Sequence, residues 1–227
     1  MIGIIGAMKI ETDAIKSMLK NKRSEQISGI DFVLGEYNGY AVVVAQCGIG
    51  KVFAAMCAQT MILQYSVSEI INVGVAGTLC KELGLLDIAI STAVVEHDMD
   101  TSPLGDPVGL ISGINVIEMP ACNRLVNQFA KIATENKKNF VCGVIASGDQ
   151  FIGNKEKKAF IHNTFRAIAC EMEGAAIGHV CYVNNVDFVI IRAISDNADD
   201  TAGAMEYPEL CRHAAEQSQQ ILQAYFS

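Results

Sequence analysis

Short runs of apolar and β-branched residues alternate along the chain with longer segments in which apolar residues recur at helical spacing. A buried strand shows as a short apolar run and an amphipathic helix as a repeat of about 3.6 residues, so the alternation predicts an α/β fold. Strands are predicted over residues 2–5, 32–37, 40–45, 69–73, 87–95, 141–146, 167–170 and 188–194. Helices are predicted over residues 9–19, 51–65, 121–136, 155–160, 172–183 and 208–224.

Turn-forming residues separate these elements without marking a boundary between domains. Asn38 and Gly39 lie between two strand-like runs and predict a two-residue hairpin turn. Residues 98–115 hold two of the four prolines and several glycines, with no clear period, which predicts a long functional loop. No internal repeat or linker is visible, so residues 1–227 are expected to form a single domain.

The predicted helix over residues 51–65 is apolar almost all round. Such a helix must be covered on more than one side. It is therefore expected either in the centre of the core or at an interface between subunits.

Composition and charge exclude several classes of protein. The 227 residues carry 17 Lys and Arg against 25 Asp and Glu, and the net charge of −8 argues against nucleic-acid binding. A hydrophobic share of 51% excludes disorder, and a charged share of only 19% points to extra burial in an oligomer. No apolar run reaches the roughly 20 residues of a membrane span, and the N-terminal apolar stretch is too short for a signal peptide. We expect a soluble, cytoplasmic protein whose partner is a small molecule or another protein.

The cysteines and histidines do not form a pattern typical of a metal site. The eight cysteines include no C-x-x-C pair and mostly lie in apolar segments, so we expect buried free thiols. The segment His97-Asp98-Met99-Asp100 lacks ligands one helical turn apart and is interpreted as a hydrogen-bonded loop. We therefore expect no metal and no cofactor.

Acidic residues follow several of the predicted strands. Glu11, Glu173 and Asp196 each come shortly after the end of a strand. Because the carboxyl ends of parallel strands share one edge of a sheet, where ligands bind, these three carboxylates are expected to face one crevice. Arg192 lies inside the apolar run of the last strand, where a guanidinium needs a partner, and a carboxylate of this crevice is the expected one.

Each of these residues also has an ordinary structural explanation. Acids such as Glu11 and Glu173 are favoured in the first turn of a helix, and Asp196 suits a turn or a helix cap. Arg192 fits a salt bridge without chemistry. The glycine segments complete neither a P-loop nor a dinucleotide fingerprint, and no histidine lies beside a serine or cysteine nucleophile.

Six motifs nevertheless follow one another in a specific order. They are G-I-I-G-A-M-x-x-E at 3–11, C-G-I-G-K at 47–51, I-I-N-V-G-V-A-G at 70–77, A-S-G-D-Q-F-I at 146–152, C-E-M-E-G-A-A-I at 170–177 and R-A-I-S-D at 192–196. Together they resemble the 5′-methylthioadenosine/S-adenosylhomocysteine nucleosidases of the nucleoside phosphorylase-like superfamily. The resemblance spans nearly the whole chain, except residues 101–135.

The resemblance implies a single-domain three-layer α/β/α sandwich around a mixed, partly closed central sheet, and a homodimer. It implies hydrolysis of the N-glycosidic bond of methylthioadenosine, adenosylhomocysteine and 5′-deoxyadenosine in methionine salvage, without a cofactor. Glu11 would be the general base for water and Asp196 the acid that protonates the leaving adenine. Residues implied at the ribose are Ala76, Gly77, Met172 and Glu173; at the adenine, Phe151 and Ile152; at the 5′ substituent, Met8, Ile49 and Tyr207; and elsewhere in the binding site, Arg192 and Ser195.

The chain departs from the family pattern in two places. Val75 stands where the family usually carries serine, and Glu96-His97-Asp98-Met99-Asp100 replaces Y-H-D-A-D. Reduced or retuned activity, and not its absence, is therefore expected. Three alternatives stay open: a nucleoside phosphorylase, although Glu11 would repel phosphate; an aminodeoxyfutalosine nucleosidase, which would share the catalytic residues; and a nucleoside-binding protein that has lost catalysis.

Overall fold

The apolar runs form the strands of one mixed sheet in the computed structural model, which describes residues 1–198 and 207–227, without the side chain of Tyr207. The strands are β1 (Ile2–Gly6), β2 (Lys20–Ile27), β3 (Ile30–Tyr37), β4 (Tyr40–Gln46), β5 (Glu69–Thr78), β6 (Ile88–Glu96), β7 (Met119–Pro120), β8 (Phe140–Ser147), β9 (Ala169–Glu171) and β10 (Asp187–Asp196). The helices are α1 (Lys9–Met18), α2 (Lys51–Tyr65), α3 (Asn123–Glu135), α4 (Lys155–Phe165), α5 (Gly174–Asn184) and α6 (Tyr207–Tyr225), with a 3₁₀ helix at Ser102–Leu104.

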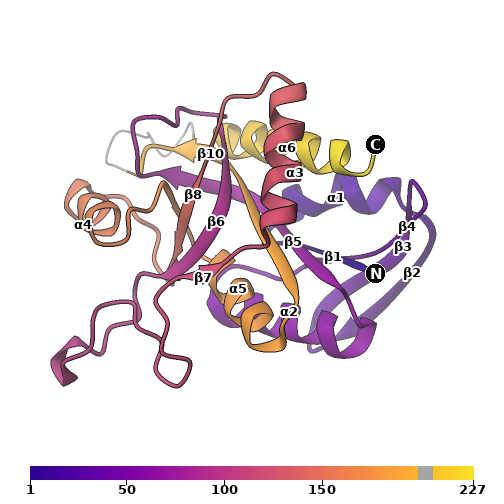
Figure 1. The fold of residues 1–227 in the computed structure, drawn as a ribbon. Coiled ribbons are helices and arrows are strands. Elements are labelled where there is room, and N and C mark those ends of the chain that lie inside the picture. The colour runs from indigo at the N-terminus through magenta and orange to yellow at the C-terminus, as the bar shows by residue number, and fades with distance from the viewer. Residues whose placement is uncertain (199–206) are drawn as a thin grey trace.

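Helices cover both faces of this sheet (Figure 1). Helix α6 packs against α1 and α3 on one face, and α2 packs against α5 on the other. The strands between these layers are buried on both sides, as parallel strands in α/β proteins are. Ile70 and Ile71 of β5 and Ile190 and Ile191 of β10 are fully buried. The predicted three-layer α/β/α sandwich with a mixed sheet is confirmed.

The sheet is partly closed because β10 pairs on both sides. It runs parallel to β5 and antiparallel to β6, and the order β10-β6-β8-β9-β5 then returns to β10. Five strands thus form a ring, while β1, β4, β3 and β2 extend the sheet outward from β5. The predicted hairpin turn is present between β3 and β4, where Asn38 and Gly39 both have positive φ.

Several predicted elements differ from those in the structure. Strand β5 was predicted to end at residue 73 but continues through residues 74–78, because β10 and β9 supply hydrogen-bonding partners there. Strand β2 was missed because its sequence, K-N-K-R-S-E-Q-I, is polar; it is held by antiparallel pairing with β3 at the edge of the sheet. Helix α4 is longer than predicted, and α5 begins two residues later. None of the described helices is both long and apolar enough to cross a membrane.

Candidate active site

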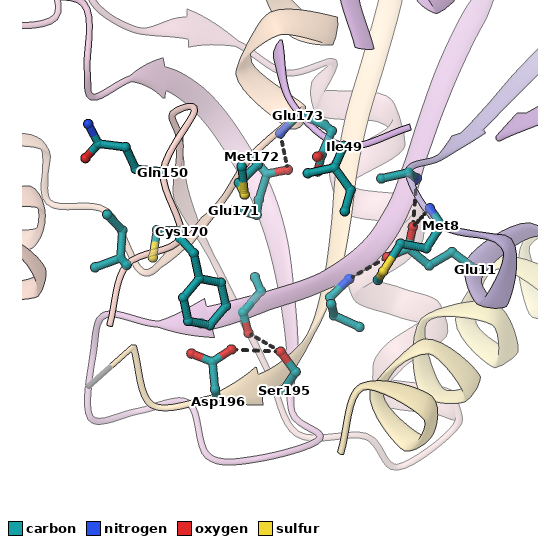
Figure 2. Close-up of a pocket in the computed structure, with 16 residues that line it drawn as sticks. Met8, Glu11, Ile49, Gln150, Cys170, Glu171, Met172, Glu173, Ser195 and Asp196 are labelled. Carbon is teal, nitrogen blue, oxygen red and sulfur yellow. Dashed lines mark hydrogen bonds between the residues drawn. The ribbon is translucent and has the colours of Figure 1, made fainter. Parts of the chain in front are cut away.

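A cavity with an empty volume of about 650 Å³ opens at the carboxyl ends of β1, β5, β9 and β10 (Figure 2). The lining residues are Ala7, Met8, Glu11, Ile49, Val75, Ala76, Gly77, Gln150, Phe151, Ile152, Cys170, Glu171, Met172, Glu173, Ser195 and Asp196. The three acids predicted to face one crevice, Glu11, Glu173 and Asp196, therefore do so.

Glu11 is fixed by backbone amides at the start of α1. Its Oε2 accepts hydrogen bonds from the N–H groups of Ala7 and Met8, at 2.7 and 2.9 Å, and its Oε1 accepts one from Val75 at 3.3 Å. Burial raises the pKa of Glu11 above its ordinary value, although the charge of Arg192 and these amides oppose that effect. A buried carboxylate with a raised pKa is a better proton acceptor than an exposed one.

The absence of a side chain at Gly74 allows this carboxylate to reach β5. A Cβ atom there would lie 2.7 Å from Glu11 Oε1 and 3.2 Å from an Nη atom of Arg192. Any larger residue would push the carboxylate out of its place.

Asp196 owes its orientation to a β-bulge at the end of β10. The pairing with β5 joins Ile194 to Ala76 and Asp196 to Gly77, so Ser195 is the extra residue. Neighbouring strand residues normally point to opposite faces, but here Ser195 and Asp196 both line the cavity. The Ser195 hydroxyl donates to Asp196 Oδ2 at 2.9 Å, and the Ala198 N–H donates to Oδ1 at 2.8 Å.

Gly77 is required beside this carboxylate for the same reason that Gly74 is required beside Glu11. A Cβ at position 77 would lie 2.7 Å from Asp196 Oδ1. Gly74 and Gly77 of β5 thus leave room for the carboxylates of Glu11 and Asp196. Figure 2 shows these two acids lying apart around the cavity.

Glu173 lies between β9 and α5 and is held by a distant loop. Its Oε1 accepts a hydrogen bond of 2.8 Å from the Gly50 N–H, at the start of α2. Burial and the neighbouring Glu171 carboxylate raise the pKa of Glu173 to about 8.

Arg192 does not line the cavity, in contrast to the binding role implied by the resemblance. Its guanidinium is 1% exposed and donates to the Asn72 side chain at 2.6 Å and to the Glu171 carboxylate. The Glu173 carboxylate is 3.9 Å away. Burial disfavours the charged form of Glu171, but the charge of Arg192 and a hydrogen bond from Ser147 outweigh it and lower its pKa. Arg192 thus influences the cavity only through its interactions with Glu171 and Glu173.

Replacing Arg192 with methionine should lower the free energy of unfolding by about 3–5 kcal/mol, because Glu171 would remain buried without its cation. Urea denaturation would measure the loss. The double variant R192M/E171Q should recover part of it, since both charges are then removed together. A single variant as stable as the wild type would show that the pair contributes no stability.

The other residues predicted for the site differ in where they lie and how exposed they are. Met8, Ile49, Ala76, Gly77, Phe151, Ile152, Met172 and Ser195 all line the cavity. Phe151 and Ile49 are more than half exposed at its mouth, whereas Ile152 is buried. The side chain of Tyr207 lies outside the described residues.

Five lining residues were not named as site residues from the sequence: Ala7, Val75, which was noted only as a departure from the family pattern, Gln150, Cys170 and Glu171. Each belongs to one of the six motifs, so motif membership was the available signal. Glu171, shortly before α5, is in a position where an acid is favoured at the start of a helix. It does accept hydrogen bonds from the Glu173 and Gly174 amides at the start of α5, but it also carries the ion pair.

The cavity carries carboxylates without cations. Of the described residues that line it, none is lysine or arginine. Within the described part of the chain, no cluster of three histidine, cysteine, aspartate or glutamate residues is arranged to hold a metal ion. A phosphate would therefore meet acids and find no positive side chain on these walls.

Comparison with known proteins gives a consistent result. An aminodeoxyfutalosine nucleosidase of Helicobacter pylori is 38% identical over 226 residues, covering 98% of this chain and 96% of the relative. A 5′-methylthioadenosine/S-adenosylhomocysteine nucleosidase of Shewanella halifaxensis is 38% identical over 200 residues, covering 88% of this chain and 87% of the relative.

Solved structures agree closely. A mutant of the Helicobacter pylori nucleosidase with 5′-methylthioadenosine in its active site has a TM-score of 0.94 and 36% identity, covering 99% of this chain and 96% of that one. The Neisseria meningitidis nucleosidase with methylthio-immucillin-A has a TM-score of 0.94 and 32% identity, covering 99% and 97%. The model of the phosphorylase superfamily matches residues 1–227. The chain therefore belongs to the phosphorylase superfamily and is one of its nucleosidases.

Proposed function

We propose that the protein hydrolyses the N-glycosidic bond of adenine nucleosides that carry a 5′ substituent, namely methylthioadenosine, adenosylhomocysteine and 5′-deoxyadenosine. The products are adenine and the free sugar, as in methionine salvage. The observation that carries the proposal is the placement of Glu11 and Asp196 apart on the wall of one cavity, which Glu173 also lines. The eight free cysteines fit a reducing compartment such as the cytoplasm.

In this proposal Asp196 is the general acid. The C1′–N9 bond breaks with its electron pair moving to the purine, and Asp196 gives a proton to N7 of the departing adenine. Phe151 covers the adenine face, and the backbone of Ile152 binds its edge. Ser195 donates to the carboxylate at 2.9 Å and so supports the charge that remains after the proton is given.

Glu11 acts as the general base on the opposite side of the sugar. It takes a proton from water as the water oxygen bonds to C1′, in the manner of the carboxylate pair of inverting glycosidases. Glu173 and Met172 hold the ribose hydroxyls, and Ala76 and Gly77 line the sugar pocket. Met8 and Ile49 contact the 5′ substituent.

Val75 retunes this site without removing its chemistry. Its backbone N–H still donates to Glu11, while its side chain offers no hydroxyl to the water or ribose. Because Arg192 is engaged with Asn72 and Glu171, it does not replace that hydroxyl. Glu11 alone then orients the water.

The test is adenine release from methylthioadenosine by the purified protein, with and without phosphate, followed by chromatography. We expect adenine and free methylthioribose at the same rate in both conditions, because no cation lines the described cavity to bind phosphate. Release only with phosphate, as the sugar 1-phosphate, would make the protein a phosphorylase. No release from any of the three nucleosides would contradict the proposal.

A second candidate substrate is aminodeoxyfutalosine. The Helicobacter pylori relative with that name is as similar to this chain as the Shewanella relative named for methylthioadenosine. The exposed position of Ile49, which contacts the 5′ substituent in this proposal, suits a long substituent. Comparing kcat/KM for the two nucleosides in one preparation decides which is preferred.

We further propose that the active form is a homodimer. Helices α2 and α5 lie side by side, and their outer faces expose Val52, Phe53, Met56, Leu63 and Val183. An apolar face of this kind is typical of an interface between subunits.

We expect light scattering to give twice the chain mass for the wild type. Met56→Glu should shift it to monomer, whereas Phe160→Glu on α4 should not; a monomeric wild type would contradict the proposal.

A further inference from the structure

Lys51, the first residue of α2, lies outside the cavity wall but connects two of the loops that form it. The first loop, residues 47–50, carries Ile49, and its Gly50 N–H donates to Glu173. The second loop, residues 148–152, follows β8 and carries Phe151. The two loops are nearly one hundred residues apart in sequence, so side chains must fix their separation.

Three hydrogen bonds form a closed ring through Lys51, Asp98 and Asp149. The Lys51 N–H donates to Asp149 Oδ1 at 2.8 Å, the Asp149 N–H donates to Asp98 Oδ2 at 2.8 Å, and Lys51 Nζ donates to Asp98 Oδ1 at 2.7 Å. A carboxylate that accepts from the first amide of a helix is also stabilised by the helix dipole. The ring therefore links the start of α2 directly to the second loop.

The ammonium group of Lys51 is held on its other side as well. It donates to Glu96 Oε2 at 3.1 Å, while Glu96 Oε1 contacts His179 of α5 at 2.9 Å. The side chain of Lys51 is only 19% exposed. Burial alone would lower its pKa, but the hydrogen bonds to Asp98 and Glu96 raise it, so the group stays charged.

The space around this ring is tight. Gly50 has a φ of +99°, and a Cβ at this position would lie 3.0 Å from Asp149 Oδ1. The same Gly50 donates its N–H to Glu173. Asp149 accepts from the N–H of Lys51, the residue next to Gly50, so a shift of Asp149 would also move the amide that binds Glu173.

We propose that Lys51 is a positioning residue that, through Asp98 and Asp149, sets the spacing between the loop that holds Glu173 and the loop that carries Phe151 and Ile152. This inference rests on the proposed function and deepens it. In the proposed function the second loop binds adenine, and the first loop holds Glu173, which binds the ribose. Lys51 therefore affects binding of the whole nucleoside more than binding of adenine alone.

The test compares two ligands by calorimetry: adenine, and the methylthioadenosine analogue in which carbon replaces N7. The analogue cannot be protonated at that position, so binding is measured without turnover. For Lys51→Met we expect the analogue to bind at least about tenfold more weakly. Adenine affinity should change by less than about twofold, because its contacts, on the second loop and at Asp196 of β10, do not include the first loop.

Asp149 supplies a matched pair of variants. Asp149→Asn keeps an oxygen acceptor for the Lys51 N–H and should bind the analogue nearly as the wild type does. Asp149→Ala loses that acceptor and should resemble Lys51→Met. Lys131→Met, which removes an exposed pair with Glu135, is the control and should leave both affinities unchanged.

The outcomes are distinct. Wild-type affinity of Lys51→Met for the analogue, or an equal loss for both ligands, would overturn the inference in favour of a merely structural role. If Lys51→Met does not fold, equal affinities of Asp149→Asn and Asp149→Ala for the analogue would overturn it. A wild-type protein that binds neither ligand contradicts the proposed function, and with it the role of Lys51.

Discussion

Asp196→Asn should lower kcat for methylthioadenosine by about 10²- to 10⁴-fold, because asparagine cannot give a proton to N7 of adenine. The local structure should persist. An asparagine oxygen can still accept from the Ala198 N–H, and the Ser195 hydroxyl can rotate to accept from the new amide. The affinity for the uncleavable N7-carbon analogue should therefore stay close to that of the wild type.

Rapid-quench measurement of a single turnover separates this effect from product release. Ser195→Ala is the graded control: it removes one donor to Asp196 and should reduce kcat far less than the loss of the acid itself. An Asp196→Asn variant with an undiminished rate of bond cleavage would remove Asp196 from the role of acid.

Glu11→Gln should also reduce kcat by about 10²- to 10⁴-fold, because an amide cannot take a proton from water. A glutamine oxygen in the place of Oε2 keeps the two shorter amide bonds, from Ala7 and Met8, and only the 3.3 Å bond from Val75 is lost. The fold and analogue binding should therefore be retained. Loss of analogue binding, with kcat little changed, would make Glu11 a binding residue and not the base.

The pH profile provides a second readout for Glu11. A base works in its deprotonated form, so wild-type kcat should rise with pH as Glu11 ionises. Burial raises the pKa of Glu11, which moves this rise from the ordinary range of glutamate toward neutral pH. In Glu11→Gln the rise should disappear; a variant that keeps the same rise would show that another group is responsible.

The sequence predicted the features that depend on local pattern and on general rules of α/β topology. Apolar runs predicted most strands, and the shared carboxyl edge of parallel strands correctly brought Glu11, Glu173 and Asp196 to one cavity. The buried charge of Arg192 correctly predicted a carboxylate partner from this site, which is Glu171.

The features that were missed depend on contacts between distant segments. The bulge that turns both Ser195 and Asp196 into the cavity arises from pairing with β5 and has no signature in R-A-I-S-D. The polar strand β2 exists only because β3 supplies its hydrogen bonds. Arg192 is a further example. The apolar run around it indicated that it is buried and has a partner, but not that it lies outside the lining of the cavity.

The pairing of β10 with both β5 and β6 also affects how the chain folds while it is being synthesised. Residues 187–196 join β5, which ends at Thr78, to β6, so the ring cannot close until a strand more than one hundred residues later has emerged from the ribosome. Contacts so distant in sequence form slowly. Until then β5 and β6 present unpaired edges, which are templates for aggregation. A nascent chain stalled before residue 187 should thus depend on chaperones far more than the finished protein.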